Sequence, residues 1–236
     1  MPPDRGRQRS FERCQQIPRR TPLDQERAEC LLSFLETVDR LKSVYRATYL
    51  TGEDRHENDA EHMSHMALFA MLFSVETGMA LNMSRVYELI LVHDLPEVIA
   101  GDTWAYDAQG RLDAHEREAR AAEDLFAPLP EDVRARLHCA WREFEDGETL
   151  EARFVHAMDR LQGASQNVFS RGRSWRQRGV SEHMVRERNA VIGETDPTLA
   201  TVLDTLLQRA VALRLWTEEP AAGFRRPGDT PTSTSV

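Results

Sequence analysis

The 236-residue sequence lacks what several common protein classes require. Its three cysteines, Cys14, Cys30 and Cys139, are too few and too widely spaced for a disulfide framework or a cysteine-rich zinc cluster. No apolar run approaches the roughly 20 residues of a membrane span. No apolar segment follows the basic N-terminal residues, so we also expect no signal peptide. These absences favour a cytoplasmic protein that does not contact a membrane.

Positive charge is also in deficit, because 30 Lys and Arg residues face 39 Asp and Glu residues, for a formal net charge of −9. This balance argues against a general nucleic-acid-binding role. The chain shows no strand-like alternation, no internal repeat and no glycine-rich phosphate loop. Its content of 41% hydrophobic and 29% charged residues is typical of a globular protein.

Helical periodicity dominates what remains, and it predicts an all-α bundle of about seven or eight helices. We expect residues 1–24 to form a disordered basic arm, residues 25–216 one helical domain, and residues 217–236 a disordered tail. Capping residues and apolar spacing predict helices that begin near Gln25, Asn58 or Asp59, Ser84, Asp113, Glu131, Leu150, Ser181 and Pro197. The helix after Ser181 is expected to be short.

One of these predicted helices ends in a polar pair. His93 and Asp94 follow the apolar run Leu89–Val92, and Pro96 then disrupts the helix. A polar pair at the end of a buried helix is costly unless it is satisfied, and a divalent metal ion would satisfy it. The alternative interpretation is a helix end followed by an acidic surface loop, here containing Glu97 and Asp102.

Three more features leave similar alternatives open. His62 falls on the apolar face of its helix, either as a core histidine bonded to a backbone carbonyl or as a metal ligand. Asp159 lies beside the apolar stripe of another helix, either paired with an arginine or bound to a metal. The basic loop Arg171–Gly179 is either a solvated charge run or an anion-binding edge of an active site.

Taken together, His62, His93-Asp94 and Asp159 resemble the H…HD…D signature of the HD-domain metal-dependent phosphohydrolase superfamily. The resemblance extends over three segments: Arg55–His62, His93–Asp102 and Ala152–Leu161. Within this superfamily, the sequence is most similar to the branch of the 5'-deoxynucleotidases and related bacterial HD hydrolases. It covers about Gln25 to Trp216 and implies an HD-type helical fold.

The resemblance implies a site for one divalent metal ion, of identity Co, Mn, Fe, Zn, Ni or Mg, held by His62, His93, Asp94 and Asp159. Two nitrogens and two carboxylates suit an octahedral ion better than closed structural zinc. Such an ion would lower the pKa of its water and offset phosphate charge.

The same resemblance implies that Glu97 and Asp102 are catalytic and assist proton transfer. It places Arg46 where the nucleotidases bind phosphate, a role that suits a guanidinium fork. Some of the bacterial relatives also share Ser174 and Trp175, which we therefore expect at the substrate. Ala47 follows Arg46, whereas the deoxynucleotidases have a bulky aromatic there, so strict preference for 2'-deoxy sugars is not implied.

The leading functional prediction is an enzyme, a phosphoric monoester hydrolase that releases phosphate from a nucleoside 5'-monophosphate or a related small phosphate ester. The alternatives are an HD-type phosphodiesterase or triphosphohydrolase, and a non-catalytic binding protein on the same fold. The binding protein would be expected to have lost a ligand of the signature, and this chain has lost none. The amphipathic helices also predict a homodimer that forms through an apolar helix face outside the site.

Overall fold

The computed structural model describes residues 23–107 and 109–216. The expected disordered arm and tail therefore lie outside the described residues, except for Leu23 and Asp24. Within the described part, eight helices have ten or more residues, in agreement with the predicted all-α bundle. The elements, in chain order, are α2 (Gln25–Val38), the 3-10 helix η1 (Asp39–Ser43), β1 (Tyr45–Tyr49), β2 (His56–Asn58), α3 (Asp59–Thr77), α4 (Met83–Val92), α5 (Glu97–Ala100), α6 (Ala114–Phe126), α7 (Glu131–Asp146), α8 (Leu150–Phe169), α9 (Arg173–Gln177), α10 (Glu182–Thr195) and α11 (Pro197–Ala212).

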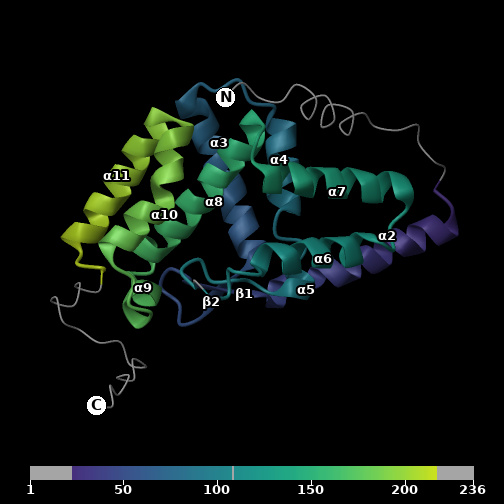
Figure 1. Cartoon of the computed structure of the whole chain (residues 1–236), viewed down its shortest axis with the longest axis horizontal. Coiled ribbons are helices and arrows are strands. Elements are labelled where there is room, and N and C mark those ends of the chain that lie inside the picture. Colours follow the sequence, from purple (N-terminus) through teal and green to yellow (C-terminus); the bar gives the residue numbers. More distant parts are fainter. Residues whose placement is uncertain (1–22, 108, 217–236) are drawn as a thin grey trace, which may run out of the picture.

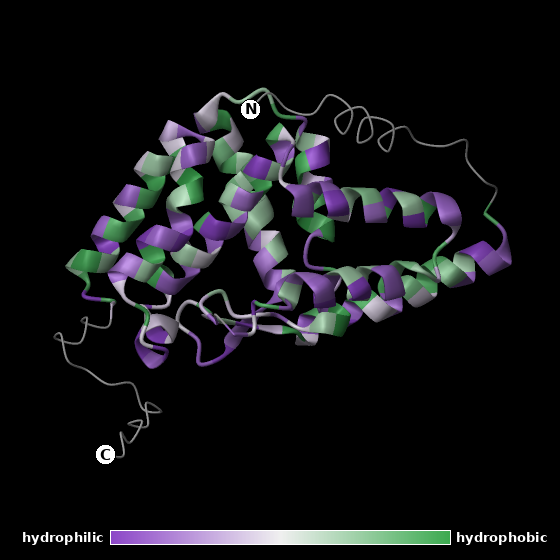
Figure 2. Cartoon of the chain, in the orientation of Figure 1, coloured by the Kyte–Doolittle hydropathy of each residue, from purple (hydrophilic) through white to green (hydrophobic). Residues whose placement is uncertain are grey.

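Helix α8 is the centre of the bundle, and Figure 1 shows it between α3 and α4 on one side and α10 and α11 on the other. Its predicted apolar stripe is confirmed, since Phe154, Val155, Met158 and Leu161 are fully buried. Figure 2 shows hydrophobic and hydrophilic residues alternating around the helices, as expected for helices that bury one face. This packing holds the residues of α3, α4 and α8 close enough to form one site.

Helices α6 and α7 extend to one side of the bundle, and α2 lies along α6 (Figure 1). Phe34 of α2 meets Phe126 of α6 with ring centroids 6.3 Å apart. Arg27 binds Asp132 at the start of α7 at 2.7 Å. The apolar face predicted for the first helix is only partly buried, because Leu32 and Leu35 remain exposed.

The helix ends follow side-chain capping, with three differences from the sequence prediction. Asn58 caps α3 in a reciprocal capping box with Glu61. Asn82, rather than Ser84, caps α4. Asp113 precedes α6 but binds the Arg117 side chain instead of capping backbone amides. The helix after Ser181 has 14 residues and is therefore not short.

A two-stranded antiparallel sheet, β1 with β2, is the main element that the sequence did not predict. The strands pair Tyr45 with Asn58 and Tyr49 with His56, and Gly52 in the connecting turn has a φ of 77°, which favours glycine. Strands of five and three residues are too short for an alternation of apolar and polar residues to be recognised in the sequence. Strand β1 packs against α8 and α9. The sheet brings Arg46 and Thr48 to the bundle interior.

No helix of the described residues is long and apolar enough to cross a membrane. Cys30 and Cys139 form no disulfide within the described part of the chain, and Cys14 lies outside it.

Candidate active site

The four predicted metal ligands converge from three helices. His62 lies in the first turn of α3, His93 ends α4, Asp94 follows it, and Asp159 lies in the middle of α8. Ligand atoms of His62, His93 and Asp94 all lie within 4.8 Å of one another. Asp159 Oδ1 lies 3.2 Å from His62 Nε2. The residues that the signature separates by almost 100 positions therefore form one cluster.

The histidine tautomers suit a cation. His93 Nδ1 donates to the carbonyl of Ile90 at 2.8 Å, and His62 Nδ1 lies 2.7 Å from Gln162 Oε1, an acceptor. Each Nε2 atom is buried and has no hydrogen-bond partner. With Nδ1 carrying a proton, Nε2 is the nitrogen of each ring that would bind a cation, next to the carboxylates of Asp94 and Asp159. Burial lowers the pKa of His93, but the charge of Asp94 outweighs burial and raises that pKa to about 8, so a cation would compete with a proton for this nitrogen. Unpartnered nitrogens beside two carboxylates are a donor set that fits a divalent metal ion.

A hydrogen-bonded network stands behind His62 and was not predicted from the sequence. The Gln162 amide nitrogen donates to Glu57 Oε1 at 2.8 Å and lies 3.2 Å from His65 Nδ1. Thr48 donates to the other oxygen of Glu57 at 2.8 Å. Since the Glu57 carboxylate is an acceptor, it orients the amide of Gln162 so that Oε1 faces His62. The network thereby determines which His62 nitrogen points to the cluster.

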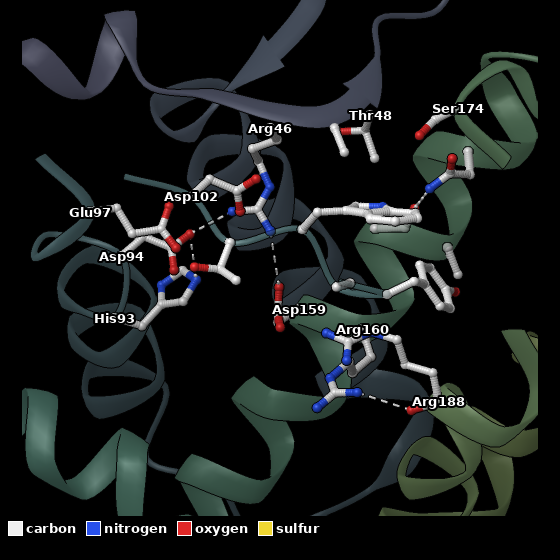
Figure 3. A pocket seen from close by; sticks show the side chains of 18 of the residues that line it. Arg46, Thr48, His93, Asp94, Glu97, Asp102, Asp159, Arg160, Ser174 and Arg188 are labelled. Atoms are coloured by element: carbon white, nitrogen blue, oxygen red, sulfur yellow. Dashed lines mark hydrogen bonds and ion pairs between the residues drawn. The ribbon is translucent and has the colours of Figure 1, made fainter. Parts of the chain in front are cut away.

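Arg46, from β1, lies among the carboxylates (Figure 3). Its Nη1 is 2.9 Å from Asp94 Oδ2 and 3.5 Å from Asp59 Oδ1. Its Nη2 is 3.8 Å from Asp159 Oδ1. The arginine partner considered for Asp159 is thus present, and it binds the whole acidic cluster rather than Asp159 alone.

The carboxyls differ in how easily they ionise. Burial raises the pKa of Asp94, but the positive charges of His93 and Arg46 outweigh burial, and the net shift is downward. Burial and the charge of Asp94 raise the pKa of Glu97 well above its ordinary value. Burial also raises the pKa of Asp102, against the effect of Arg46. Asp94 is therefore a permanent negative charge, while the raised pKa values of Glu97 and Asp102 favour their protonated forms and suit these carboxyls to proton transfer.

Asp59 is a member of the site that the sequence analysis overlooked. It is fully buried, its Oδ2 has no partner, and it lies within 4.8 Å of Asp94 and Glu97 oxygens. Burial and the charge of Asp94 raise its pKa to about 7. Its place inside the segment Arg55–His62 is the one signal in the sequence, where the local pattern predicts only a possible helix cap.

A cavity of about 220 Å³ opens from this cluster. Arg46, Glu97 and Asp102 line it together with His93, Asp94 and Asp159, and so do Ser174 and Trp175 of α9. Trp175 is almost fully buried and stacks on Trp216, with ring centroids 4.8 Å apart. All the predicted site residues except His62 line the cavity, and His62 lies behind it as part of the cluster.

The basic segment Arg171–Gly179 is partly helical, and none of its arginines lines this cavity. Arg173 binds Asp54 and lies 3.9 Å from the centroid of the Tyr49 ring. Arg178 lies 4.7 Å from the centroid of the Trp104 ring. The cavity is instead lined by Arg160 and Arg188, which the sequence analysis did not single out as site residues.

Residues 38–199, which contain the His/Asp cluster at the junction of three helices, match the family model described as HD domain. The chain belongs to the HD domain family. This confirms the family predicted from the three motifs.

Several characterised or solved proteins are similar to this chain. The human 5'-deoxynucleotidase HDDC2 is 36% identical over 136 residues, which are 57% of this chain and 65% of that protein. The 5'-deoxynucleotidase YBR242W of Saccharomyces cerevisiae is 27% identical over 154 residues, which are 62% of this chain and 63% of that protein. The matched region thus spans less than two thirds of these curated relatives.

Two solved structures share the fold. A predicted metal-dependent phosphohydrolase from Magnetospirillum magnetotacticum is 36% identical with a TM-score of 0.76, over 83% of this chain and 98% of that one. A conserved hypothetical protein from Pyrococcus furiosus is 20% identical with a TM-score of 0.54, over 75% of this chain and 99% of that one. At this identity the likeness shows the fold alone.

Proposed function

We propose that this protein is a metal-dependent phosphohydrolase that releases phosphate from a nucleoside 5'-monophosphate or a related small phosphate ester. The observation that carries the proposal is the pair of unpartnered buried Nε2 atoms of His62 and His93 beside the Asp94 and Asp159 carboxylates, at the inner end of a cavity lined by Arg46. The names of the similar proteins support it, because they include 5'-deoxynucleotidases and a predicted metal-dependent phosphohydrolase.

His62, His93, Asp94 and Asp159 would bind one divalent ion in this proposal. When bound, the ion lowers the pKa of a coordinated water and offsets the charge of the phosphate. Glu97 and Asp102 line the cavity beside these residues, and their raised pKa values suit each of them to accept or donate a proton. One of them would take the proton of the attacking water, and the other would protonate the leaving alkoxide.

Arg46 would bind the phosphate, and Ser174 and Trp175 would contact the rest of the substrate. Arg46 is the cation nearest to the acidic cluster, and without it the carboxylates would repel a phosphate dianion. The small Ala47 also lines the cavity, so we do not propose discrimination against a 2'-hydroxyl.

The test is phosphate release from a panel of nucleoside monophosphates, diphosphates and triphosphates, phosphodiesters and sugar phosphates. The metal-stripped full chain would be assayed with Co²⁺, Mn²⁺, Mg²⁺ or no metal. We expect release from a monophosphate only with metal. Cleavage of diesters or triphosphates in preference to monoesters would support the alternative HD activities. A lack of turnover with every metal would favour a binding protein.

We expect Arg46→Ala to lower kcat/KM by about ten- to a hundred-fold, the usual cost of a lost charge-assisted contact of about 1.5–3 kcal/mol. Metal affinity should stay the same or rise, because Arg46 also binds Asp94, and its removal frees that carboxylate. Steady-state kinetics and metal titration of the same sample measure the two effects. Arg40→Ala, on the exposed surface of η1, is the control.

If Arg46 only neutralises the carboxylates, its removal should tighten metal binding and leave kcat/KM unchanged at saturating metal. That result would take Arg46 out of the phosphate site.

We expect Gln162→Leu to weaken metal affinity by about 10–100-fold, since groups that orient a metal-binding histidine have effects of this size. Without the Gln162 oxygen, nothing holds the Nδ1 proton of His62 in place. Calorimetric titration of the metal-stripped protein with Mn²⁺ measures the affinity. Gln166→Leu is a matched control, because Gln166 lies one turn further along α8, is equally buried, and donates to the carbonyl of Tyr49 instead.

Equal metal affinities in the two glutamine variants would show that Gln162 serves only packing. Melting temperatures of both variants separate a loss of stability from a loss of metal binding.

We further propose a cytoplasmic homodimer that acts on small phosphorylated molecules and uses neither nucleic acid nor a membrane. An exposed apolar stripe on α3 supports self-association, since Leu68, Met71, Leu72 and Val75 recur at helical spacing. Light scattering at micromolar concentration tests the dimer, and a monomer mass would contradict it.

A further inference from the structure

Two arginines line the active-site cavity beyond Asp159, away from His93 and Asp94 (Figure 3). They are Arg160 on α8 and Arg188 on α10. We infer that Arg160 and Arg188 form a second anion-binding subsite, so that the substrate is a phosphate ester that also carries a carboxylate or a second phosphate. This inference rests on the proposed function and narrows its substrate class.

Neither guanidinium has an acidic partner among the described residues. The Arg160 Nη1 donates to the backbone carbonyl of Arg188 at 3.0 Å, and the Arg188 guanidinium lies 5.8 Å from the centroid of the Tyr106 ring. By contrast, the buried or half-buried Arg27, Arg46 and Arg85 each bind a carboxylate at 2.6–2.9 Å. Arginines that are withdrawn from water normally have such a partner.

The two positive charges also act on one another. Burial lowers the pKa of Arg188 to about 10, and the charges of Arg160 and Arg111 add to this effect. The side chain thus remains charged at neutral pH. Asp159 is the carboxylate that opposes the shift, but as a proposed metal ligand its charge would be shared with the ion. A neutral acceptor would satisfy the N–H groups and leave the charge uncompensated, whereas an anion satisfies both.

The position of the pair separates it from the phosphate that is cleaved. Arg46 and the metal-binding residues gather at one end of the cavity, and Arg160 and Arg188 lie at another part of its wall. The aromatic rings of Trp104, Tyr106 and Trp175 also line the cavity and offer apolar surface to the carbon framework of a substrate. A molecule with an anionic group at each end of a short apolar body fits this arrangement.

The test compares the binding of matched compounds that differ by one anionic group. One pair is glycerol 3-phosphate and 3-phosphoglycerate, and the other is adenosine 5'-monophosphate and adenosine 3',5'-bisphosphate. Affinities are measured by calorimetry at constant ionic strength on the Mn²⁺-loaded full chain carrying Asp102→Asn, which is expected to keep the metal and lose turnover. We expect the doubly anionic member of at least one pair to bind about 10–100-fold more tightly, as one charge-assisted contact contributes.

Arg188→Gln and Arg160→Gln should reduce the ratio of the two affinities to about one. Arg186→Gln is the control, because Arg186 lies on the same helix, is exposed and pairs with Glu182. The inference is wrong if neither pair shows a preference. It is also wrong if Arg188→Gln weakens both members of a pair by the same factor, because the arginine would then hold the cleaved phosphate or maintain the fold.

Binding is measured in the Asp102→Asn background and phosphate release in the parent chain, so the two proposals can fail separately. Absence of phosphate release from all four compounds and from the nucleotide panel would refute the hydrolase function. An Arg188-dependent preference in binding would still establish the anion subsite.

Discussion

Asp94→Ala is expected to abolish both metal binding and phosphate release while the helical fold persists. Asp94 lies at the point where the ligand atoms of His62 and His93 meet, and its carboxylate is 3.1 Å from His93 Nε2. A bound metal ion contributes several kcal/mol of transition-state stabilisation, so its loss should slow turnover on the order of 10³-fold or more. Metal analysis of the purified variant and phosphate-release kinetics measure the two effects.

The fold should survive because Asp94 contributes no apolar packing and carries a permanent charge that is costly to bury. Removing that carboxylate leaves Arg46 with Asp59 and Asp159 as partners. Circular dichroism and the melting temperature check this expectation. Asp124→Ala, on the exposed face of α6, is the matched control and should behave as the parent protein. Full metal occupancy in Asp94→Ala would falsify the assignment of this ligand.

Glu97→Gln and Asp102→Asn are expected to keep the metal and lose turnover by about 10²–10⁴-fold, the usual contribution of a general acid or base. Both carboxyls line the cavity, and burial raises the pKa of each. The amides preserve the shape of the side chains but cannot take up or release the proton. Metal titration and kcat measured at saturating metal and substrate distinguish this role from ligation.

A metal-free preparation of either variant would identify that residue as a ligand. For Glu97 the metal titration decides between proton transfer and ligation, because oxygens of Glu97, Asp59 and Asp94 lie within 4.8 Å of one another. Asp59→Asn provides the comparison, since it removes a neighbouring charge from the same cluster. Turnover that survives both Glu97→Gln and Asp102→Asn would assign proton transfer to another group.

The sequence by itself determined the family and most of the helices, and it predicted the two histidines and two aspartates that the structure brings together. These features depend on local information: apolar residues at helical spacing define the buried stripe of α8, and capping residues such as Asn58 and Thr149 begin helices. The two histidines and two aspartates occur within the segments Arg55–His62, His93–Asp102 and Ala152–Leu161, whose motifs can be recognised in the sequence. The helices predicted near Ser84 and Asp113 begin at Met83 and Ala114, and only the capping side chains differ from the prediction. Asn82 takes the cap in place of Ser84, and Arg117 binds the Asp113 carboxylate that would otherwise cap α6.

Only the tertiary structure decided which side chains complete the site. Gln162 is 100 residues from His62, and Arg188 is 28 residues from Arg160, so no local pattern connects them. Their meeting depends on how α3, α8 and α10 are rotated against one another, and packing of the whole core sets that rotation. The same packing turns Arg173 toward Asp54 and Tyr49, and Arg178 toward Trp104, instead of the cavity. Sequence spacing specifies the face of a helix that is buried, and the arrangement of the other helices specifies what that face touches.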